Sequence, residues 1–349
     1  MAASSAGPIT VCVPAYNAAA FIEETVAHIA RQSHPDMRVL IAVDLSTDGT
    51  ADLCRKFARD DRFRLVVHPQ RINWIRNING MIEKVDTDDY CIIPHDDLIE
   101  PDYLVALQET LDRNELAAVA FTDIVAFGEL KGGVIQRSID GDLFGRVMTF
   151  FVDHFDAVAF RGVVRRSRAG PNLQLKSNAF AGYAADSLWM LQVLAHGELV
   201  RMPRRVGAQY HKYYRIGSQH HRWLKWDREL RTEAWIEHCA QCAEIAMTLP
   251  FAPAQKQLIV HATLQRAVKR FKQMGWPPFV GDLTGAHQAL IQSCVAARLL
   301  GIGERGPGTL AKVRRIPQYQ EIAERLWGKP DTDLIGRGGD NPTEFANSG

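Results

Sequence analysis

The residues best suited to chemistry are Asp96 and Asp97, two adjacent carboxylates that follow the apolar run 90–94. Pro101 then predicts the start of a helix, so the pair lies between a buried strand and a helix, where open α/β sheets bind ligands. Neighbouring carboxylates repel each other and are costly to desolvate, and a divalent cation bound with an anionic ligand relieves both effects. The alternative is a polar turn whose aspartates cap the following helix.

Alternating strands and helices are expected to position this turn. Apolar runs predict strands over 9–14, 37–43, 63–68, 90–94 and 116–121. Helical patterns lie between them, over 18–31, 50–59, 75–84 and 101–113. The second of these helices is expected to use Ser46 or Thr47 as its N-cap. Strands and helices that alternate about every 25 to 30 residues are typical of βαβ units. We therefore expect an α/β fold with a Rossmann-like, mostly parallel sheet flanked by helices.

The second half of the chain predicts a mainly helical region after a less regular stretch. Glycines interrupt the pattern from about residue 128, and a helix is then expected over 184–196. Further helices are predicted over 227–247, 253–274, 283–300 and 317–327. The glycine-rich piece 301–308 is interpreted as a linker, and the polar residues from 330 onward as a disordered tail.

Composition indicates a globular protein with no nucleic-acid partner. The chain has 349 residues, of which 46% are hydrophobic and 23% charged, and its formal net charge is +1. Its six cysteines are spread along the sequence, as in proteins that keep their thiols reduced, which predicts a cytoplasmic location. The first residues lack the basic and apolar segments of a secretory signal, and no apolar run approaches the roughly 18 residues of a membrane span.

The most basic part of the chain, 201–231, has nine Lys or Arg residues against two acids. One interpretation is a solvated charged face. Another is a surface for a diphosphate or an anionic acceptor, because His211 and Lys212 are interleaved with tyrosines. A third is peripheral contact with lipid headgroups through the tryptophans next to its basic residues.

Four segments in fixed order carry a resemblance to a known family. They are 13–17 (VPAYN), 44–50 (DLSTDGT), 76–77 (RN) and 95–97 (HDD), the last followed by Pro101 and Asp102. Together they resemble the nucleotide-binding half of the family-2 glycosyltransferases, which are inverting enzymes of the GT-A fold. The resemblance covers about 8–125 well and 150–215 loosely, and it does not extend over 230–349.

The resemblance implies a division of the chain. A GT-A domain would occupy 1–225, with a nucleotide-binding half over 8–125 and an acceptor half over 126–225. A helical region would follow over 226–329, and then the tail 330–349. The helical region is expected to cover the acceptor side or to mediate self-association into a homo-oligomer.

The resemblance also implies a set of site residues. Those expected at the nucleotide are Pro14, Ala15, Tyr16, Asn17, Asp44, Arg76, His95 and Asp96. Within the set, Asp44 would accept a hydrogen bond from the base, typically from the imide of uracil. Asp96 matches the aspartate that binds a divalent cation, Mn²⁺ or Mg²⁺, with Asp97 beside it. His211 resembles a downstream histidine that some relatives use near the metal or diphosphate.

An inverting transfer needs a base for the acceptor hydroxyl, and the matching position is Asp186 at the start of the helix 184–196. Asp186 is otherwise an ordinary first-turn acid that interacts with the helix dipole. The expected function is therefore transfer of a sugar from a nucleotide-diphosphate donor, with UDP the expected nucleotide. The acceptor would be a hydroxyl of a glycan, a lipid-linked molecule or another compound, in glycan or polysaccharide assembly.

The chain departs from the family pattern at three positions. Val43, Pro94 and Ala185 stand where many relatives have acids, so a metal would have fewer protein ligands. These departures leave open a catalytically degenerate GT-A domain that binds nucleotides or acts as a scaffold. A third hypothesis is a nucleotidyltransferase, which uses a similar sheet and releases pyrophosphate.

Overall fold

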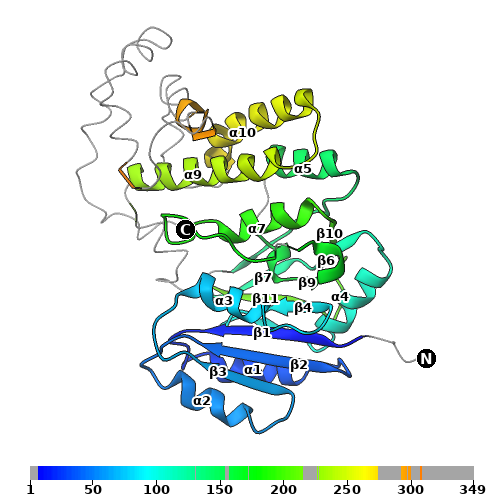
Figure 1. Ribbon diagram of the computed structural model, residues 1–349. Helices are drawn as coiled ribbons and strands as arrows, with labels where there is room; N and C mark the ends of the chain where they lie inside the picture. Colours follow the sequence, from blue (N-terminus) through cyan, green and yellow to red (C-terminus); the bar gives the residue numbers. More distant parts are fainter. Residues whose placement is uncertain are drawn as a thin grey trace.

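Figure 1 shows a computed structural model of the chain. The structure describes residues 7–129, 131–153, 157–171, 173–214, 226, 228–273, 292–296, 298–299 and 307–308. The predicted helix 317–327, the tail from 330 and most of the predicted linker 301–308 lie outside the described residues.

The larger sheet has the strand order β10-β6-β9-β4-β1-β2-β3. Its strands are β1 (Ile9–Ala15), β2 (Met37–Val43), β3 (Phe63–Val67), β4 (Asp89–Ile92), β6 (Ala117–Phe121), β9 (Val163–Arg165) and β10 (Glu198–Arg201). All neighbours pair in parallel except β9, which lies antiparallel between β4 and β6. The predicted mostly parallel sheet is therefore confirmed, and β9 and β10 are the two strands of this sheet that the alternating pattern did not predict.

The helices between the first strands also lie close to their predicted positions. They are α1 (Ile22–Ala30), α2 (Thr50–Phe57), α3 (Trp74–Ile82) and α4 (Tyr103–Asp112). The predicted N-cap of α2 is wrong, because Gly49 takes that position with φ of 87°. The side chain of Asp48 instead accepts hydrogen bonds from the backbone N–H and the hydroxyl of Thr50.

A second, smaller sheet was not predicted. It has the order β5-β11-β7-β8 and consists of β5 (Leu98–Ile99), β11 (Tyr210–Tyr214), β7 (Ile124–Gly128) and β8 (Gly132–Val134). Strand β11 comes from the basic stretch 201–231 and pairs with β5, which directly follows the predicted metal motif. The smaller sheet therefore brings the basic stretch against residues 95–100.

The second half of the chain is mainly helical, as predicted. The less regular stretch forms α5 (Leu143–Val152), the short 3-10 helix η1 (Ala159–Arg161) and α6 (Arg166–Ala169). Then come α7 (Ala185–Leu194), α9 (Arg228–Met247) and α10 (Pro253–Gln273). Of the predicted helix 283–300, residues 292–296 and 298–299 are described, and they are helical. In Figure 1, α7 lies between the larger sheet and α9.

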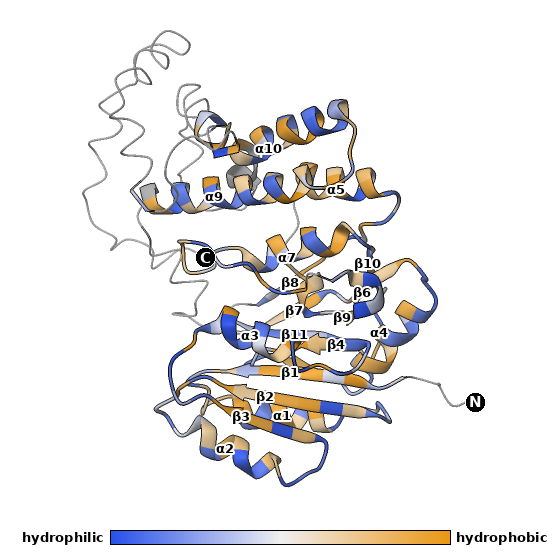
Figure 2. Ribbon diagram, viewed as in Figure 1, coloured by the Kyte–Doolittle hydropathy of each residue, from blue (hydrophilic) through white to orange (hydrophobic). Residues whose placement is uncertain are grey.

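The hydrophobic core is continuous from the larger sheet to the C-terminal helices. Strands β1 and β2 are mostly apolar in Figure 2, as expected for strands buried on both faces. The same buried cluster includes Ile9 of β1, Trp189 of α7, Ala246 of α9 and Ile259 of α10. Part of α9 and of α10 therefore packs on the core of the sheet, and other residues of these helices, such as Trp235 and Ala267, form a second buried cluster.

Two further expectations bear on the location of the protein. All six cysteines are free and buried. In the part of the chain that the structure describes, no helix is long and apolar enough to cross a membrane.

Candidate functional site

The predicted nucleotide residues lie where neighbouring strands end. Strand β1 pairs in parallel with β2 on one side and with β4 on the other. Tyr16 directly follows β1, Asp44 directly follows β2, and His95 comes three residues after β4. The carboxyl ends of parallel strands meet at one edge of a sheet, so the structure brings these three segments together.

The loops after β1 and β2 are held to each other by hydrogen bonds. The Asn17 backbone N–H donates to Ser46 Oγ at 3.0 Å, and the Thr47 N–H donates to Asn17 Oδ1 at 3.1 Å. The Ala18 N–H donates to Thr50 Oγ1 at 2.7 Å. Asn17 has a left-handed φ of 45°, a conformation that asparagine tolerates better than most residues. These bonds fix the path of the chain next to Tyr16.

Asp44 is almost completely buried, with 1% of its surface exposed, and backbone groups surround its carboxylate. Oδ1 accepts from the N–H groups of Leu45 and Ile72, each at 2.9 Å. Oδ2 accepts from the N–H of Asn73 at 3.0 Å. Asn73 is also the N-cap of α3, and its side chain accepts from the backbone N–H of Arg76. Asp44 therefore ties the end of β2 to the start of α3.

Arg71 is a residue of this site that the sequence reasoning missed. Its Nη1 donates to Asp44 Oδ2 in an ion pair, and its Cζ lies 3.3 Å from the centroid of the Tyr16 ring. The predicted basic residue, Arg76, is exposed in the first turn of α3. Only the fold reveals the role of Arg71, because the loop after β3 carries it to the end of β2.

The predicted metal motif divides between an accessible and a buried carboxylate. His95 Nδ1 lies 3.2 Å from the carbonyl oxygen of Pro14, and its Nε2 is buried with no hydrogen-bond partner among the described residues. Asp96 is half-buried, whereas Asp97 is 2% exposed. Within the described residues no group of three or more His, Cys, Asp or Glu side chains lies close enough to hold a metal ion.

Asp97 points into the smaller sheet. Its carboxylate accepts from the Tyr210 hydroxyl at 2.6 Å and from the Tyr213 backbone N–H at 2.8 Å, and Arg161 Nε lies 3.6 Å from Oδ2. Burial raises the pKa of Asp97 above its ordinary value, while the charge of Arg161 lowers it and that of Asp96 raises it. Asp97 thus links the metal motif to β11.

Arg161 is a largely buried cation, with 16% of its side chain exposed, that interacts with two of the predicted site acids. Its Nη1 donates to the carbonyl of Ala157 at 3.2 Å, and its own carbonyl accepts from the Tyr103 hydroxyl at 2.7 Å. Burial lowers the pKa of Arg161, but Tyr210, Asp97 and Asp186 raise it to a value above the ordinary one. Asp97 and Asp186 therefore act electrostatically on the same guanidinium.

Asp186 is half-buried in the first turn of α7, and the loop before it has an unusual backbone. Ala181 and Ala184 have left-handed φ values of 51° and 53°, a conformation that is unfavourable for residues with a Cβ atom. Between them, Gly182 packs so closely on α3 that an added Cβ would lie 2.3 Å from Cδ1 of Ile75. The segment that presents Asp186 is thus docked on the helix whose start is bound to Asp44.

His211 and Asp123 are committed to other protein groups. His211 Nε2 lies 3.1 Å from Glu100 Oε1. The carboxylate of Asp123, which follows β6, accepts two hydrogen bonds from Arg201 at 2.7 and 2.6 Å. Of the basic stretch, residues 215–225 lie outside the described part of the chain.

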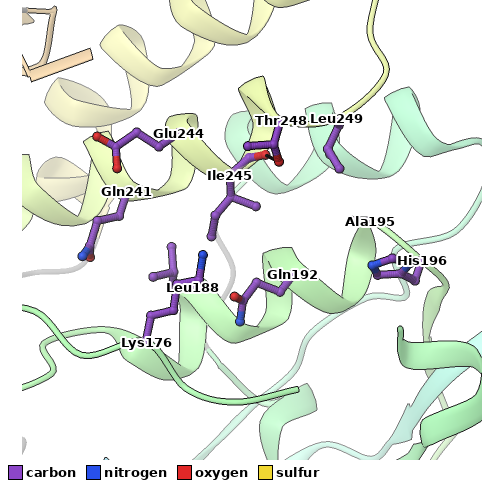
Figure 3. A pocket seen from close by; sticks show the side chains of 10 residues that line it. All are labelled: Lys176, Leu188, Gln192, Ala195, His196, Gln241, Glu244, Ile245, Thr248 and Leu249. Atoms are coloured by element: carbon purple, nitrogen blue, oxygen red, sulfur yellow. Dashed lines mark hydrogen bonds between the residues drawn. The ribbon is translucent and has the colours of Figure 1, made fainter. Parts of the chain in front are cut away.

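A separate pocket of about 270 Å³ lies between α7 and α9 (Figure 3). Leu188 and Gln192 of α7, with Ala195 at its C-cap, face Gln241 and Ile245 of α9 across it. At 100° per residue these α7 positions lie on the opposite face of the helix from Asp186. None of the predicted site residues lines this pocket.

Comparisons with known proteins agree with this arrangement. The sequence profile of glycosyl transferase family 2 matches residues 10–168. TuaG of Bacillus subtilis, named as a candidate teichuronic acid biosynthesis glycosyltransferase, is 41% identical over 59 residues. That match covers 17% of this chain and 23% of TuaG, so the chain spans less than a quarter of the relative's length.

Solved structures resemble a much larger part of the chain. Residues 1–349 of S. aureus TarS in complex with UDP-GlcNAc match with a TM-score of 0.64 at 15% identity, over 91% of this chain and 88% of that one. The mannosyltransferase PcManGT of Pyrobaculum calidifontis, in complex with GDP-Man and Mn²⁺, matches with a TM-score of 0.51 at 16% identity, over 93% and 89%. These likenesses confirm the predicted GT-A fold with its helical C-terminal region.

Proposed function

Residues 10–168 of this chain belong to glycosyl transferase family 2, and from this we propose that the protein transfers a sugar from a nucleotide-diphosphate donor to a hydroxyl acceptor with inversion. The observation that carries the proposal is the ion pair of Arg161 with Asp97, at 3.6 Å, together with the electrostatic interaction of the same guanidinium with Asp186. This observation supports a donor that binds beside Asp96 and a general base, Asp186, that is provided by α7.

The nucleotide is proposed to bind along the ends of β1 and β2. The segment Pro14, Ala15, Tyr16 and Asn17 supports this, because Pro14 and Ala15 end β1 and the hydrogen bonds of Asn17 fix the chain next to Tyr16. UDP is the nucleotide that we propose. Arg76 is exposed close by, so its cation is available to the diphosphate.

A divalent cation fits this site with the diphosphate as its main ligand. Mg²⁺ usually keeps several waters and binds through one or two carboxylates together with substrate phosphates, so a three-residue protein cage is not required. Asp96 is the carboxylate that we propose as the ligand, since it is half-buried at the end of the sheet whereas Asp97 is 2% exposed. When bound, the cation would neutralise the charge that develops on the leaving diphosphate.

Asp186 is proposed as the general base that removes the proton of the acceptor hydroxyl. One of its oxygens accepts from the N–H of Ser187 at 2.9 Å, and this bond orients the carboxylate. General bases contribute about 10²- to 10⁴-fold to a rate, so Asp186 would be a large part of catalysis.

Glycan or polysaccharide assembly is the process that we propose, in view of the name of TuaG. A cytoplasmic location, at or near a membrane surface, remains part of the proposal, and the free, buried state of the cysteines supports it. The acceptor that we propose is a hydroxyl group of a glycan, of a lipid-linked molecule or of another compound.

The direct test offers the protein a panel of UDP-, GDP- and dTDP-sugars with Mn²⁺ or Mg²⁺. We expect at least one donor to raise the melting temperature and to be hydrolysed slowly to a nucleoside diphosphate. A protein that neither binds nor hydrolyses any donor would contradict the proposal. Release of pyrophosphate would indicate the nucleotidyltransferase hypothesis.

A catalytically degenerate domain is the second candidate, and Val43, Pro94 and Ala185 in place of acids favour it. It predicts that nucleotides bind but that no turnover occurs, even with the true acceptor. Turnover that depends on Asp186 would exclude it.

A further inference from the structure

The side chain of Arg71 occupies the space between the two groups that are proposed to read the nucleobase. Its guanidinium is stacked on the Tyr16 ring at 3.3 Å and paired with Asp44 at the same time. A guanidinium is planar and carries N–H donors at its edge, so it has the shape and polarity of a base that stacks on Tyr16 and donates to Asp44. Both positions cannot be filled by Arg71 and a nucleobase at once.

The hydrogen bonds of Asp44 show how little room is left for a ligand. A carboxylate has about four lone-pair sites. Leu45 and Ile72 fill both sites of Oδ1, and Asn73 fills one site of Oδ2. Arg71 fills the fourth. The three backbone bonds are part of the connection between β2 and α3, so Arg71 is the one donor that can leave without unfolding the loop.

Arg71 is far more accessible than the carboxylate that it pairs with. Its side chain is 45% exposed, whereas that of Asp44 is 2% exposed. Because its own side is open to water, the guanidinium can be hydrated once it leaves Asp44 and Tyr16. At exposed positions an ion pair and a cation–aromatic contact are each worth up to about a factor of five to ten, so a ligand has to offset a moderate cost to displace Arg71.

We propose that Arg71 occupies the nucleobase position of the free protein and is displaced when a nucleotide binds, which leaves Asp44 a single lone pair with which to read the base. This inference rests on the proposed function, since it concerns the base of the same donor. Arg71 then sets both the affinity for the nucleotide and the kind of base accepted.

The single lone pair discriminates between bases. Uracil and thymine present one ring N–H, which a single oxygen site can accept. Guanine presents its N1–H and its N2 amino group side by side and pairs best with two carboxylate oxygens, but Oδ1 of Asp44 is already filled. The site should therefore favour uridine and thymidine over guanosine.

The test is a calorimetric titration of uridine into the natural protein, Arg71→Ala and Arg64→Ala. Uridine lacks phosphates, so contacts between the released Arg71 and a diphosphate do not enter the measurement. We expect Arg71→Ala to bind uridine about 5- to 30-fold more tightly, because no ion pair or stacking contact has to be broken. Arg64 is exposed on β3, so its variant removes the same charge elsewhere and should match the natural protein.

Guanosine provides the second measurement. We expect both the natural protein and Arg71→Ala to bind it at least about tenfold more weakly than uridine, since leaving one of its paired donors without a partner costs about a factor of ten or more. Arg71→Lys keeps the ion pair but loses the planar stacking group, so it should bind uridine with an affinity between those of the natural protein and Arg71→Ala. This variant decides the question if Arg71→Ala does not fold.

The outcomes separate the inference from the proposed function. Suppose that UDP binds but that Arg71→Ala binds uridine no more tightly than the natural protein. The displacement of Arg71 is then wrong, and the proposed function stands. If Arg71→Ala does not fold, the same comparison is made with Arg71→Lys. If guanosine binds as tightly as uridine, the inference that a single lone pair of Asp44 recognises the base is wrong. If neither uridine nor UDP binds to any of the proteins, both the inference and the proposed function are wrong.

Discussion

At Asp97 a carboxylate is buried between Arg161, Tyr210 and the backbone of Tyr213. Its neighbour Asp96 is half-buried, although the two residues are identical in type and adjacent in sequence. The sequence reasoning treated both as metal-site residues because it had no information on which way either side chain points. Their surroundings differ because β11 pairs with β5, next to the motif, and provides the hydrogen bonds that bury Asp97.

The burial of Asp97 predicts a specific pH dependence of stability. Its pKa in the folded protein lies above the ordinary value of 3.8, mainly because of burial. The folded state then holds the proton more tightly than the unfolded state, so this contribution to stability is complete below about pH 3.8 and is lost as the pH rises through the folded pKa. We expect the free energy of unfolding of Asp97→Asn to lack this decline.

The measurement is urea denaturation of both proteins between pH 3.5 and 7, compared as a difference at each pH. The difference in unfolding free energy, natural protein minus Asp97→Asn, should fall as the pH rises. Asp61→Asn, a change at an exposed position, serves as the matched control. A difference that stays constant over this range would show that Asp97 does not titrate as its burial requires.

Arg71 illustrates what sequence reasoning at the residue scale could not reach. Asp44 was predicted from the resemblance to the family, in which an acid follows the second strand, and the structure does put it at the sheet edge. Nothing in the spacing indicates that an arginine 27 positions later would pair with it. That contact depends on the return of the chain from β3, which is set by tertiary packing.

At the scale of elements, the strands with strong apolar runs were predicted and the short or polar ones were not. Strands β1 to β4 lie within one or two residues of their predicted bounds, because buried parallel strands need continuous apolar sequence. Strand β5 has only two residues, and β11 reads YHKYY inside a basic stretch. Their pairing is decided by neighbours that are distant in sequence, so no local pattern marks them.

The loop before α7 gives an element-scale prediction. Gly182→Ala would place a Cβ 2.3 Å from Cδ1 of Ile75 at a residue whose φ is 77°. We expect a loss of stability of at least about 2 kcal/mol, from the left-handed backbone and the overpacking together. Turnover should fall as well, because Asp186 is displaced from Arg161.

Gly80→Ala is the matched control for this change. Gly80 lies inside α3, and an added Cβ would meet nothing within 4 Å. Alanine should stabilise the helix by roughly 0.5 to 1 kcal/mol. Thermal denaturation of both variants checks the pair, and equal effects would mean that the contact between Gly182 and Ile75 does not hold the loop.

At the scale of the whole molecule, the C-terminal helices share the core of the sheet. The sequence predicted α9 and α10 from their helical patterns but separated them from the rest at residue 225. Buried residues such as Ala246 of α9 and Ile259 of α10 join the same cluster as β1, and α9 contacts α7 while α10 contacts α5. The division into domains remains a prediction, and the shared core indicates that the helices contribute to the stability of the sheet.

Ile259→Ala tests this contribution. Ile259 is completely buried in α10, so its truncation should destabilise the protein by about 2 to 5 kcal/mol. Sheet and helices share one core, so we expect a single unfolding transition. Ile259→Ala should lower its temperature, and a bound nucleotide should raise it. Leu258→Ala, at a neighbouring residue that is 52% exposed, should change stability by less than about 0.5 kcal/mol. Two separate transitions, of which only one responds to Ile259→Ala, would contradict the shared core.

The central claim is that Asp186 acts as a base on an acceptor while the donor is held from the side of Asp96. The measurement is donor turnover and UDP affinity of Asp186→Asn, with Asp140→Asn as an exposed control that should leave both unchanged. We predict that Asp186→Asn binds UDP as tightly as the natural protein but turns over at least about 100-fold more slowly. Turnover equal to that of the natural protein would contradict the account.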